Sequence, residues 1–180
     1  MAGQAQVTRV VLTAWDGGMF GTAEERDEAC ERLMPVMARL KAASVPVVVF
    51  TERDRAELET VRERLGWIDP FITESGSASF TWVDHNPFES SLCEEEGNYF
   101  VEMLGCPYVQ ARAGLRVIAN VVPHPLKGFG DYTVPQLERA AGLSEAAAHR
   151  AKAREFSEPF MTPKAVDAET LQQAAEEMGI

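Results

Sequence analysis

Residues 7–20 read VTRVVLTAWDGGMF, and this stretch decides the fold. An apolar run within it ends at Asp16, which is followed by two glycines. A short buried strand that breaks at a carboxylate and two glycines is typical of open α/β sheets, which present chemistry at the carboxyl ends of their strands. A charged, amphipathic segment at 23–43 and a second apolar run at 45–50 follow. This β-α-β order predicts two parallel strands joined by a helix.

The rest of the chain continues this alternation of helical and strand patterns. We expect a helix at 51–65, strands at 69–73 and 78–83, short helices at 135–141 and 144–153, a strand at 155–161 and a helix at 167–178. Thr51 or Asp54 could cap the first of these helices. A polar, acidic stretch at 85–96 separates the two groups and is interpreted as a crossover into a second unit. The fold class that this pattern predicts is α/β.

Composition is that of a soluble globular protein and excludes several kinds of partner. Hydrophobic residues make up 46% of the chain and charged residues 25%. The net charge of −11 provides no basic patch, so neither nucleic acid nor a membrane is expected as a partner. Three cysteines without CxxC spacing indicate neither a disulfide framework nor a zinc site. With no signal-peptide pattern and no apolar run of about 20 residues, the cytoplasm is the expected location.

Five positions at the end of the first strand resemble the first motif of the haloacid dehalogenase (HAD) superfamily of phosphatases. That motif is Asp-x-Asp-Gly-Thr after a buried strand, and here it reads Ala14-Trp15-Asp16-Gly17-Gly18. The resemblance makes Ala14 the counterpart of the family's phosphate-attacking Asp, and Asp16 the counterpart of its general acid. Gly18 stands in place of the Thr. The resemblance therefore implies a phosphatase fold from which the attacking carboxylate is absent.

Four further segments are similar to one branch of that superfamily, the mannosyl-3-phosphoglycerate phosphatases. VVVFTERDRAE at 47–57 resembles the second motif, a buried strand that ends in Ser or Thr. FITESGSASF at 71–80 resembles the branch's Phe-Ile-x-Glu-Asn-Gly segment, with Ser75 in place of Asn. GNYFVEMLG at 97–105 and REFSEPF at 154–160 complete the match. Four matching segments in the same order are more specific than any one motif.

The matching segments imply a site for an anionic sugar ligand. Its phosphate- and substrate-binding residues would be Thr51, Arg53, Arg55, Glu74, Ser75, Gly76, Arg154 and Glu158, with Asp16 in a degenerate general-acid position. Each has a structural alternative. Thr51 could simply cap a helix, and the Glu-Ser-Gly sequence could form an ordinary turn. Asp16 could cap its own turn, Arg53 and Arg55 could be surface arginines of a helix, and Arg154 and Glu158 could form an exposed ion pair.

The resemblance implies a partial Rossmann-like HAD core at 1–83 plus 161–180 and a small α+β cap domain at 84–160. Complete enzymes of this family have two motifs after the cap: a Lys that stabilises the phosphoryl group and a Gly-Asp-x-x-x-Asp cluster that holds magnesium. Neither occurs before Ile180, so the chain is interpreted as truncated. Of the family's magnesium ligands only the Asp16 carbonyl would remain, and one neutral oxygen does not hold Mg²⁺. No metal or cofactor is expected, although intact relatives use Mg²⁺.

These departures predict a catalytically impaired HAD homologue, a pseudoenzyme that binds a partner or an anionic sugar. The alternative is a phosphatase acting on a phosphorylated sugar-glycerate, completed by a second polypeptide that supplies the Lys and the metal-binding motif. Ala14 could also be an engineered trapping substitution, or the chain a fragment; the second change at Gly18 favours a natural pseudoenzyme.

A homodimer is also expected. In the HAD fold, later sequence covers the outer edge of the first strand at 7–13, and an open apolar edge promotes association.

Overall fold

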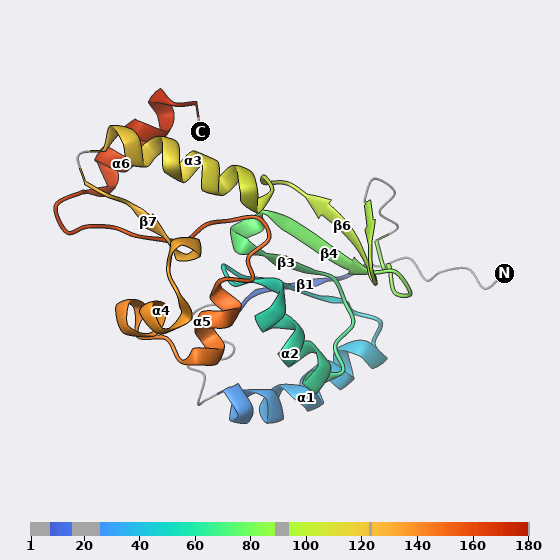
Figure 1. Ribbon diagram of the computed structural model, residues 1–180. Helices are drawn as coiled ribbons and strands as arrows, with labels where there is room; N and C mark the ends of the chain where they lie inside the picture. Colours follow the sequence, from blue (N-terminus) through green and yellow to red (C-terminus); the bar gives the residue numbers. More distant parts are fainter. Residues whose placement is uncertain (1–7, 16–25, 89–93, 123, 180) are drawn as a thin grey trace. The chain divides into compact units, whose positions relative to one another are not determined.

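The computed structural model describes residues 8–15, 26–88, 94–122 and 124–179 (Figure 1). The chain divides into two compact units, Met1–Gly105 and Cys106–Ile180, here called the N-terminal and C-terminal units. This boundary differs from the expected core and cap. Residues 94–103 pair with the sheet of the N-terminal unit, and the final helix at 168–177 belongs to the C-terminal unit.

The N-terminal unit is built on a six-stranded sheet with the strand order β1-β2-β3-β4-β6-β5. The strands are β1 (Val11–Ala14), β2 (Val47–Phe50), β3 (Phe71–Thr73), β4 (Ala78–Trp82), β5 (Glu94–Glu96) and β6 (Tyr99–Met103). β1, β2 and β3 are parallel, whereas β4, β6 and β5 continue the sheet with antiparallel pairing. The predicted β-α-β unit and the hairpin after the third strand are confirmed.

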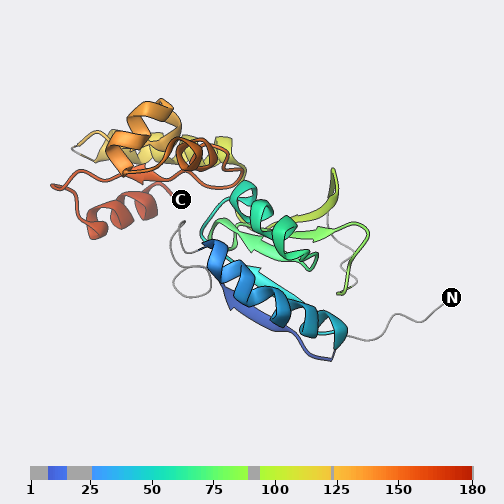
Figure 2. The ribbon, with the colours of Figure 1, turned by 90° about the horizontal axis from the view of Figure 1, so that it is seen from below.

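Two helices connect the parallel strands, α1 (Arg26–Ala42) and α2 (Arg55–Leu65). α2 begins four residues later than expected, because Asp54 rather than Thr51 is its N-cap: the Asp54 carboxylate accepts a hydrogen bond from the Glu57 backbone N–H at 2.9 Å. The helix ends at Gly66, whose φ of 58° lies in the left-handed region that favours glycine. Figures 1 and 2 show α1 and α2 on the same side of the sheet.

The core of this unit lies between the helices and one face of the sheet. The rings of Phe71 and Phe80 are stacked with their centres 5.0 Å apart, and Tyr99 meets both rings edge-on. Leu58 and Val61 of α2 are buried. Alternate residues of each strand point to this face, as the period-two geometry of strands requires.

The C-terminal unit is mainly helical. Its elements are α3 (Tyr108–Val121), β7 (Lys127–Gly128), α4 (Val134–Ala141), α5 (Glu145–Ala151), β8 (Phe160–Met161) and α6 (Ala168–Glu177). β7 and β8 form a two-stranded antiparallel pair, so the expected strand at 155–161 is confined to its last two residues. α3 and α6 pack together around a small apolar core of Leu115, Val122, Leu126, Val166 and Ala174. In the described part of the chain, none of the helices has the length and apolar character that a bilayer crossing requires.

Candidate functional site

The carboxyl ends of β1 and β2 lie side by side in the N-terminal unit. Ala14 pairs with Phe50, and the Trp15 backbone N–H donates to the Phe50 carbonyl at 2.9 Å. Thr51, directly after β2, is fully buried. Ala14 thus ends its strand beside the loop that begins at Thr51, and its side chain is a methyl group that offers no oxygen for attack or for a metal. Asp16 lies outside the described residues.

Backbone hydrogen bonds join the loop after β2 to the turn after β3. The Thr51 hydroxyl accepts from the Arg53 N–H at 3.1 Å, and the Thr51 carbonyl accepts from the Ser75 N–H at 3.0 Å. The Glu74 N–H in turn donates to the Arg53 carbonyl at 3.0 Å. The structure therefore brings together four of the residues that the sequence singled out. The Thr51 hydroxyl thus accepts a hydrogen bond within its own loop and does not cap α2.

The turn Glu74–Gly76 has an unusual backbone. Glu74, Ser75 and Gly76 have φ angles of 49°, 60° and 94°, and the first two are non-glycine residues in a region that L-residues seldom occupy. The Ser77 hydroxyl holds the turn by donating to the Glu74 carbonyl at 2.7 Å. Glu74 itself is buried. Such conformations cluster at ligand-binding sites. They therefore favour a ligand-binding role for this turn over the alternative of an ordinary surface turn.

The two arginines of this region make different contacts. Arg53 Nη1 lies 2.6 Å from Glu57 Oε1, with the arginine side chain partly exposed beside the turn. Arg55 lies over the rings of Phe80 and Tyr99, at 5.3 Å and 5.8 Å from their centres, and its guanidinium is 3.7 Å from Glu59. Arg53 is therefore placed at the edge of the candidate site, whereas the guanidinium of Arg55 packs on the aromatic core.

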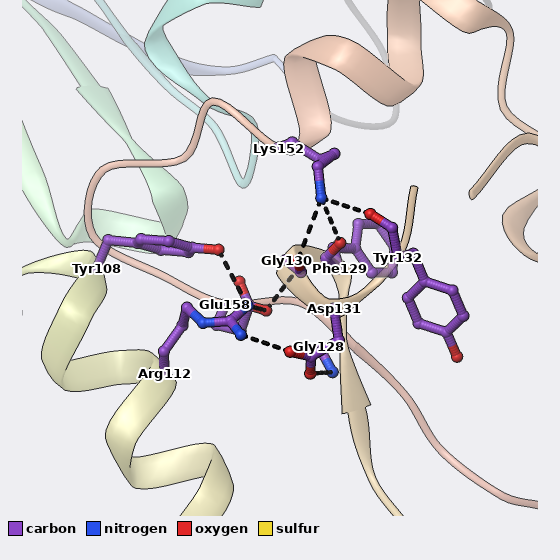
Figure 3. Close-up of polar contacts among 9 residues, drawn as sticks. All are labelled: Tyr108, Arg112, Gly128, Phe129, Gly130, Asp131, Tyr132, Lys152 and Glu158. Atoms are coloured by element: carbon purple, nitrogen blue, oxygen red, sulfur yellow. Dashed lines mark hydrogen bonds and ion pairs between the residues drawn. The ribbon is translucent and has the colours of Figure 1, made fainter. Parts of the chain in front are cut away.

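The other two expected residues, Arg154 and Glu158, lie in the C-terminal unit. Arg154 Nη1 donates to the Ser157 hydroxyl at 2.9 Å. The Glu158 side chain is only 2% exposed and accepts from Arg112 Nη1 at 3.0 Å and from the Gly130 N–H at 2.9 Å (Figure 3). Glu158 is thus not the exposed ion-pair partner of the alternative interpretation; it is the buried centre of a polar network.

Arg112 is the residue that organises this network, and the sequence analysis missed it. Its Nη1 donates to Glu158 and to the Tyr108 hydroxyl at 3.4 Å, and its Nη2 donates to Asp131 at 2.5 Å (Figure 3). The hydrogen bonds to Tyr108 and Asp131, together with both carboxylate charges, raise the pKa of Arg112 despite its partial burial. Burial alone would raise the pKa of Asp131, but the Arg112 hydrogen bond and charge and the Gly128 N–H outweigh it and lower that pKa.

Lys152, which directly follows α5, makes hydrogen bonds to the 3₁₀ turn Phe129–Asp131 and to the residue after it. Its Nζ donates to the carbonyls of Phe129, Gly130 and Tyr132 at 3.1 Å, 3.3 Å and 2.6 Å (Figure 3). Side chains also pack directly against the glycines of this turn: a Cβ on Gly130 would collide with the Arg112 guanidinium. The Gly-Phe-Gly-Asp sequence at 128–131 is the signal in the sequence that could have pointed to this close approach.

Curated proteins of known name resemble this chain over most of its length. It is 31% identical over 170 residues to the glucosyl-3-phosphoglycerate/mannosyl-3-phosphoglycerate phosphatase of Persephonella marina, a match that covers 94% of this chain and 61% of the relative. The protein of the same name from Methanococcoides burtonii is 35% identical over 151 residues, with 84% and 54% covered. The chain is a homologue of the mannosyl-3-phosphoglycerate phosphatases, members of the HAD superfamily.

This HAD homologue spans about half to three-fifths of the length of the curated relatives it matches. The mannosyl-3-phosphoglycerate phosphatase of Pyrococcus horikoshii is 32% identical over 124 residues, which cover 69% of this chain and 50% of the relative. No family model matches the chain. A crystal structure of a Thermoplasma acidophilum protein covers 96% of this chain and 72% of its own at 9% identity and a TM-score of 0.45, which is too weak a likeness to support an argument.

Magnesium, which intact HAD phosphatases use, does not fit the described residues of this homologue. Mg²⁺ prefers charged oxygen ligands in octahedral geometry. Ala14 offers none at the end of β1, and the described ranges contain no group of three or more His, Cys, Asp or Glu side chains that could hold a metal ion.

Proposed function

We propose that this chain is a catalytically impaired HAD homologue that acts by binding, either to a partner polypeptide or to an anionic sugar ligand. The observation that carries the proposal is Ala14 at the carboxyl end of β1, beside the Thr51 loop. Covalent phosphoryl transfer in this superfamily needs a carboxylate oxygen that attacks phosphorus, and positioned charge around the phosphoryl group. A methyl group at this position supplies neither. We propose the cytoplasm as the place of this role.

The retained loops favour ligand binding over a purely structural fold. The Thr51 loop and the turn Glu74–Gly76 are held together by backbone hydrogen bonds, and the turn keeps a left-handed backbone at two non-glycine residues. Arg53 lies at their edge as a partly exposed guanidinium, which suits a phosphate or carboxylate. We propose Arg154 and Glu158 as ligand-binding residues of the C-terminal unit, considered by itself.

The test is a phosphatase assay with mannosyl-3-phosphoglycerate and an aryl phosphate in the presence of magnesium, using the full 180-residue chain. We expect no turnover above that of an Asp16→Asn control. In parallel, calorimetry with mannosyl-3-phosphoglycerate should detect binding that Arg53→Gln weakens and that Arg39→Gln, on α1, leaves unchanged. Magnesium-dependent turnover well above the control would overturn the impairment, and absent binding would overturn the sugar ligand.

A second candidate is a phosphatase acting on a phosphorylated sugar-glycerate and completed by another polypeptide. It is favoured by one observation, that the matched region is only 61% of the Persephonella marina relative. The second polypeptide would supply the Lys, the magnesium carboxylates and Mg²⁺ itself. Turnover that appears only when the remaining part of that relative is added would support this candidate over the first.

A further inference from the structure

Three backbone carbonyl oxygens of the C-terminal unit converge on one point. They belong to Phe129, Gly130 and Tyr132, and they lie 3.1 Å, 3.3 Å and 2.6 Å from Nζ of Lys152 (Figure 3). The lysine follows α5 directly and is 20 to 23 residues further along the chain. Its ammonium group therefore enters, from a separate element, a cluster of oxygens that one short segment provides. We call these three oxygens the carbonyl cluster.

A cluster of this kind requires a positive charge at its centre. Each carbonyl oxygen is the negative end of a peptide dipole, so three that point at one place repel one another unless a cation lies between them. Proteins bind metal ions by the same arrangement, as in potassium channels, where backbone carbonyls replace the hydration shell of the ion. The carbonyl cluster thus has the form of a cation site, and its cation is the ammonium group of Lys152.

The direction of the carbonyls does not depend on Lys152 alone. Two of the three peptide units are also held through their N–H groups, which point away from the carbonyls: that of Phe129–Gly130 donates to Glu158 at 2.9 Å, and that of Tyr132–Thr133 donates to the Gln136 side chain at 2.8 Å. The N–H of Phe129 donates to the Pro159 carbonyl at 2.8 Å, next to the pairing of β7 with β8. The oxygens should therefore remain convergent when the ammonium group is removed.

The distances and the chemistry of the ligands select the class of ion. Mg²⁺ requires oxygens at about 2.0–2.1 Å and Ca²⁺ at about 2.3–2.6 Å, and both ions favour carboxylates. The carbonyl cluster holds its cation at 2.6–3.3 Å with neutral oxygens. The carboxylates beside the turn, Asp131 and Glu158, accept hydrogen bonds from Arg112 instead. The site therefore suits a singly charged ion of about the size of ammonium, and potassium has that charge and size.

We propose that the carbonyl cluster is a monovalent-cation site that Lys152 fills with its own ammonium group, and that a potassium ion binds there when this group is removed. Lys152 acts as a tethered cation, which makes the turn independent of the salts in solution. The Gly130 N–H of the same turn donates to Glu158, so the cation also helps to position that carboxylate. The proposal rests on contacts within the C-terminal unit and does not depend on the proposed function.

The experiment removes the tethered cation and supplies free ones. Lys152→Ala, in the full 180-residue chain, leaves room for an ion, and thermal unfolding is followed by circular dichroism in potassium, sodium, lithium and tetramethylammonium chloride at equal ionic strength. Tetramethylammonium is too large to enter the site. We expect potassium to raise the melting temperature of the variant by about 3 °C or more over tetramethylammonium, with a saturable dependence on concentration. Sodium should act less and lithium least.

Two controls separate binding at the site from general effects of salt. The wild-type chain and Lys164→Ala, at an exposed position, both retain the Lys152 ammonium group and should show no such preference for potassium. Lys152→Ser keeps a small polar side chain and repeats the test if Lys152→Ala does not fold in tetramethylammonium. Folding that only potassium restores would support the proposal in the same way as a raised melting temperature.

Three results would overturn the inference. The first is a response of Lys152→Ala and Lys152→Ser to potassium no larger than that of the two controls, or failure of both variants to fold in potassium. The second is stronger stabilisation of the variants by calcium than by potassium, which would contradict a monovalent site. The third is anomalous diffraction from rubidium-soaked crystals of Lys152→Ala that places the ion away from the carbonyl cluster. These readouts are melting temperatures and an ion position, so their failure is distinguishable from failure of the proposed function.

Discussion

The guanidinium carbon of Arg62 lies 4.3 Å from the centre of the Phe71 ring, inside the core of the N-terminal unit. Trp67 and Tyr99 place two more rings around it, at 4.9 Å and 5.7 Å. The residue is 3% exposed, and its two Nη atoms have no hydrogen-bond partner within the described part of the chain. Burial lowers the pKa of Arg62. The charges of Tyr99, Glu59 and Asp69 act to raise this pKa, but the effect of burial is larger. Contacts of the guanidinium with the ring faces, together with packing of the aliphatic part of the side chain, therefore hold Arg62 in place.

This arrangement predicts that the shape of Arg62 matters more than its charge. Arg62→Met keeps an unbranched stem among the rings and removes a buried charge, so we expect a loss of at most about 1 kcal/mol in the free energy of unfolding. Arg62→Ala leaves a cavity and should cost about 2–4 kcal/mol. Urea unfolding followed by tryptophan fluorescence measures both, because all three tryptophans lie in the N-terminal unit. Arg64→Ala, on the exposed side of α2, is the control. Equal losses of unfolding free energy in Arg62→Met and Arg62→Ala would mean that the charge of Arg62, and not its shape, stabilises the packing of the rings.

The sequence predicted the parallel part of the sheet because its signals are local. The apolar runs that became β2 and β3 end at polar residues, and the amphipathic segments between the strands became α1 and α2. β5 could not be predicted in this way. Its three residues are Glu94, Glu95 and Glu96, which carry no strand pattern and pair only because β6 lies alongside them. The acidic stretch at 85–96 predicts a crossover, whereas its last three residues pair with β6 within the N-terminal unit.

The candidate site was predictable where it follows a strand and unpredictable where it depends on distant pairing. Thr51 and the Glu74–Gly76 turn follow β2 and β3 directly, so the strand pattern places them at one edge of the sheet. Arg112 lies 46 residues before Glu158, and nothing in the spacing of the two residues indicates that they meet. Tertiary packing of α3 on the turn at 129–131 decides that contact.

The three hydrogen bonds of Lys152 predict that it stabilises the C-terminal unit. Lys152→Met keeps the aliphatic stem and leaves the carbonyls of Phe129, Gly130 and Tyr132 without their donor, so we expect a loss of about 1–3 kcal/mol in the free energy of unfolding. Circular dichroism at the helical minimum during urea unfolding measures the loss. Lys164→Met, at an exposed position, is the matched control and should change little. A loss equal to that of the control would mean that water replaces the donor at no cost.

The lowered pKa of Asp131 predicts that the stability of the C-terminal unit depends on pH. Its pKa in the folded protein lies below the ordinary value of 3.8, because the effect of Arg112 outweighs that of burial. A carboxylate with a lowered pKa contributes stability above its unfolded pKa, and this contribution is lost as the pH falls through the folded pKa. The melting temperature of the C-terminal unit should therefore fall below about pH 4, and less steeply in Asp131→Asn. Thermal unfolding followed by circular dichroism tests this, with Glu177→Gln as the control. Parallel slopes in wild type and Asp131→Asn would contradict it.

Restoring a carboxylate at the end of β1 should not restore phosphatase activity. Ala14→Asp places an oxygen beside the Thr51 loop, but the described residues offer no cluster of three or more His, Cys, Asp or Glu side chains to bind magnesium. Residues that act as one catalytic unit are strongly non-additive, so one returned group recovers little of the rate. The assay is magnesium-dependent hydrolysis of mannosyl-3-phosphoglycerate, with Ala14→Asn as a control of the same shape. The same variant should become active only if a second polypeptide supplies the Lys and the carboxylates. Activity of Ala14→Asp alone would mean that this chain already holds those groups outside its described residues.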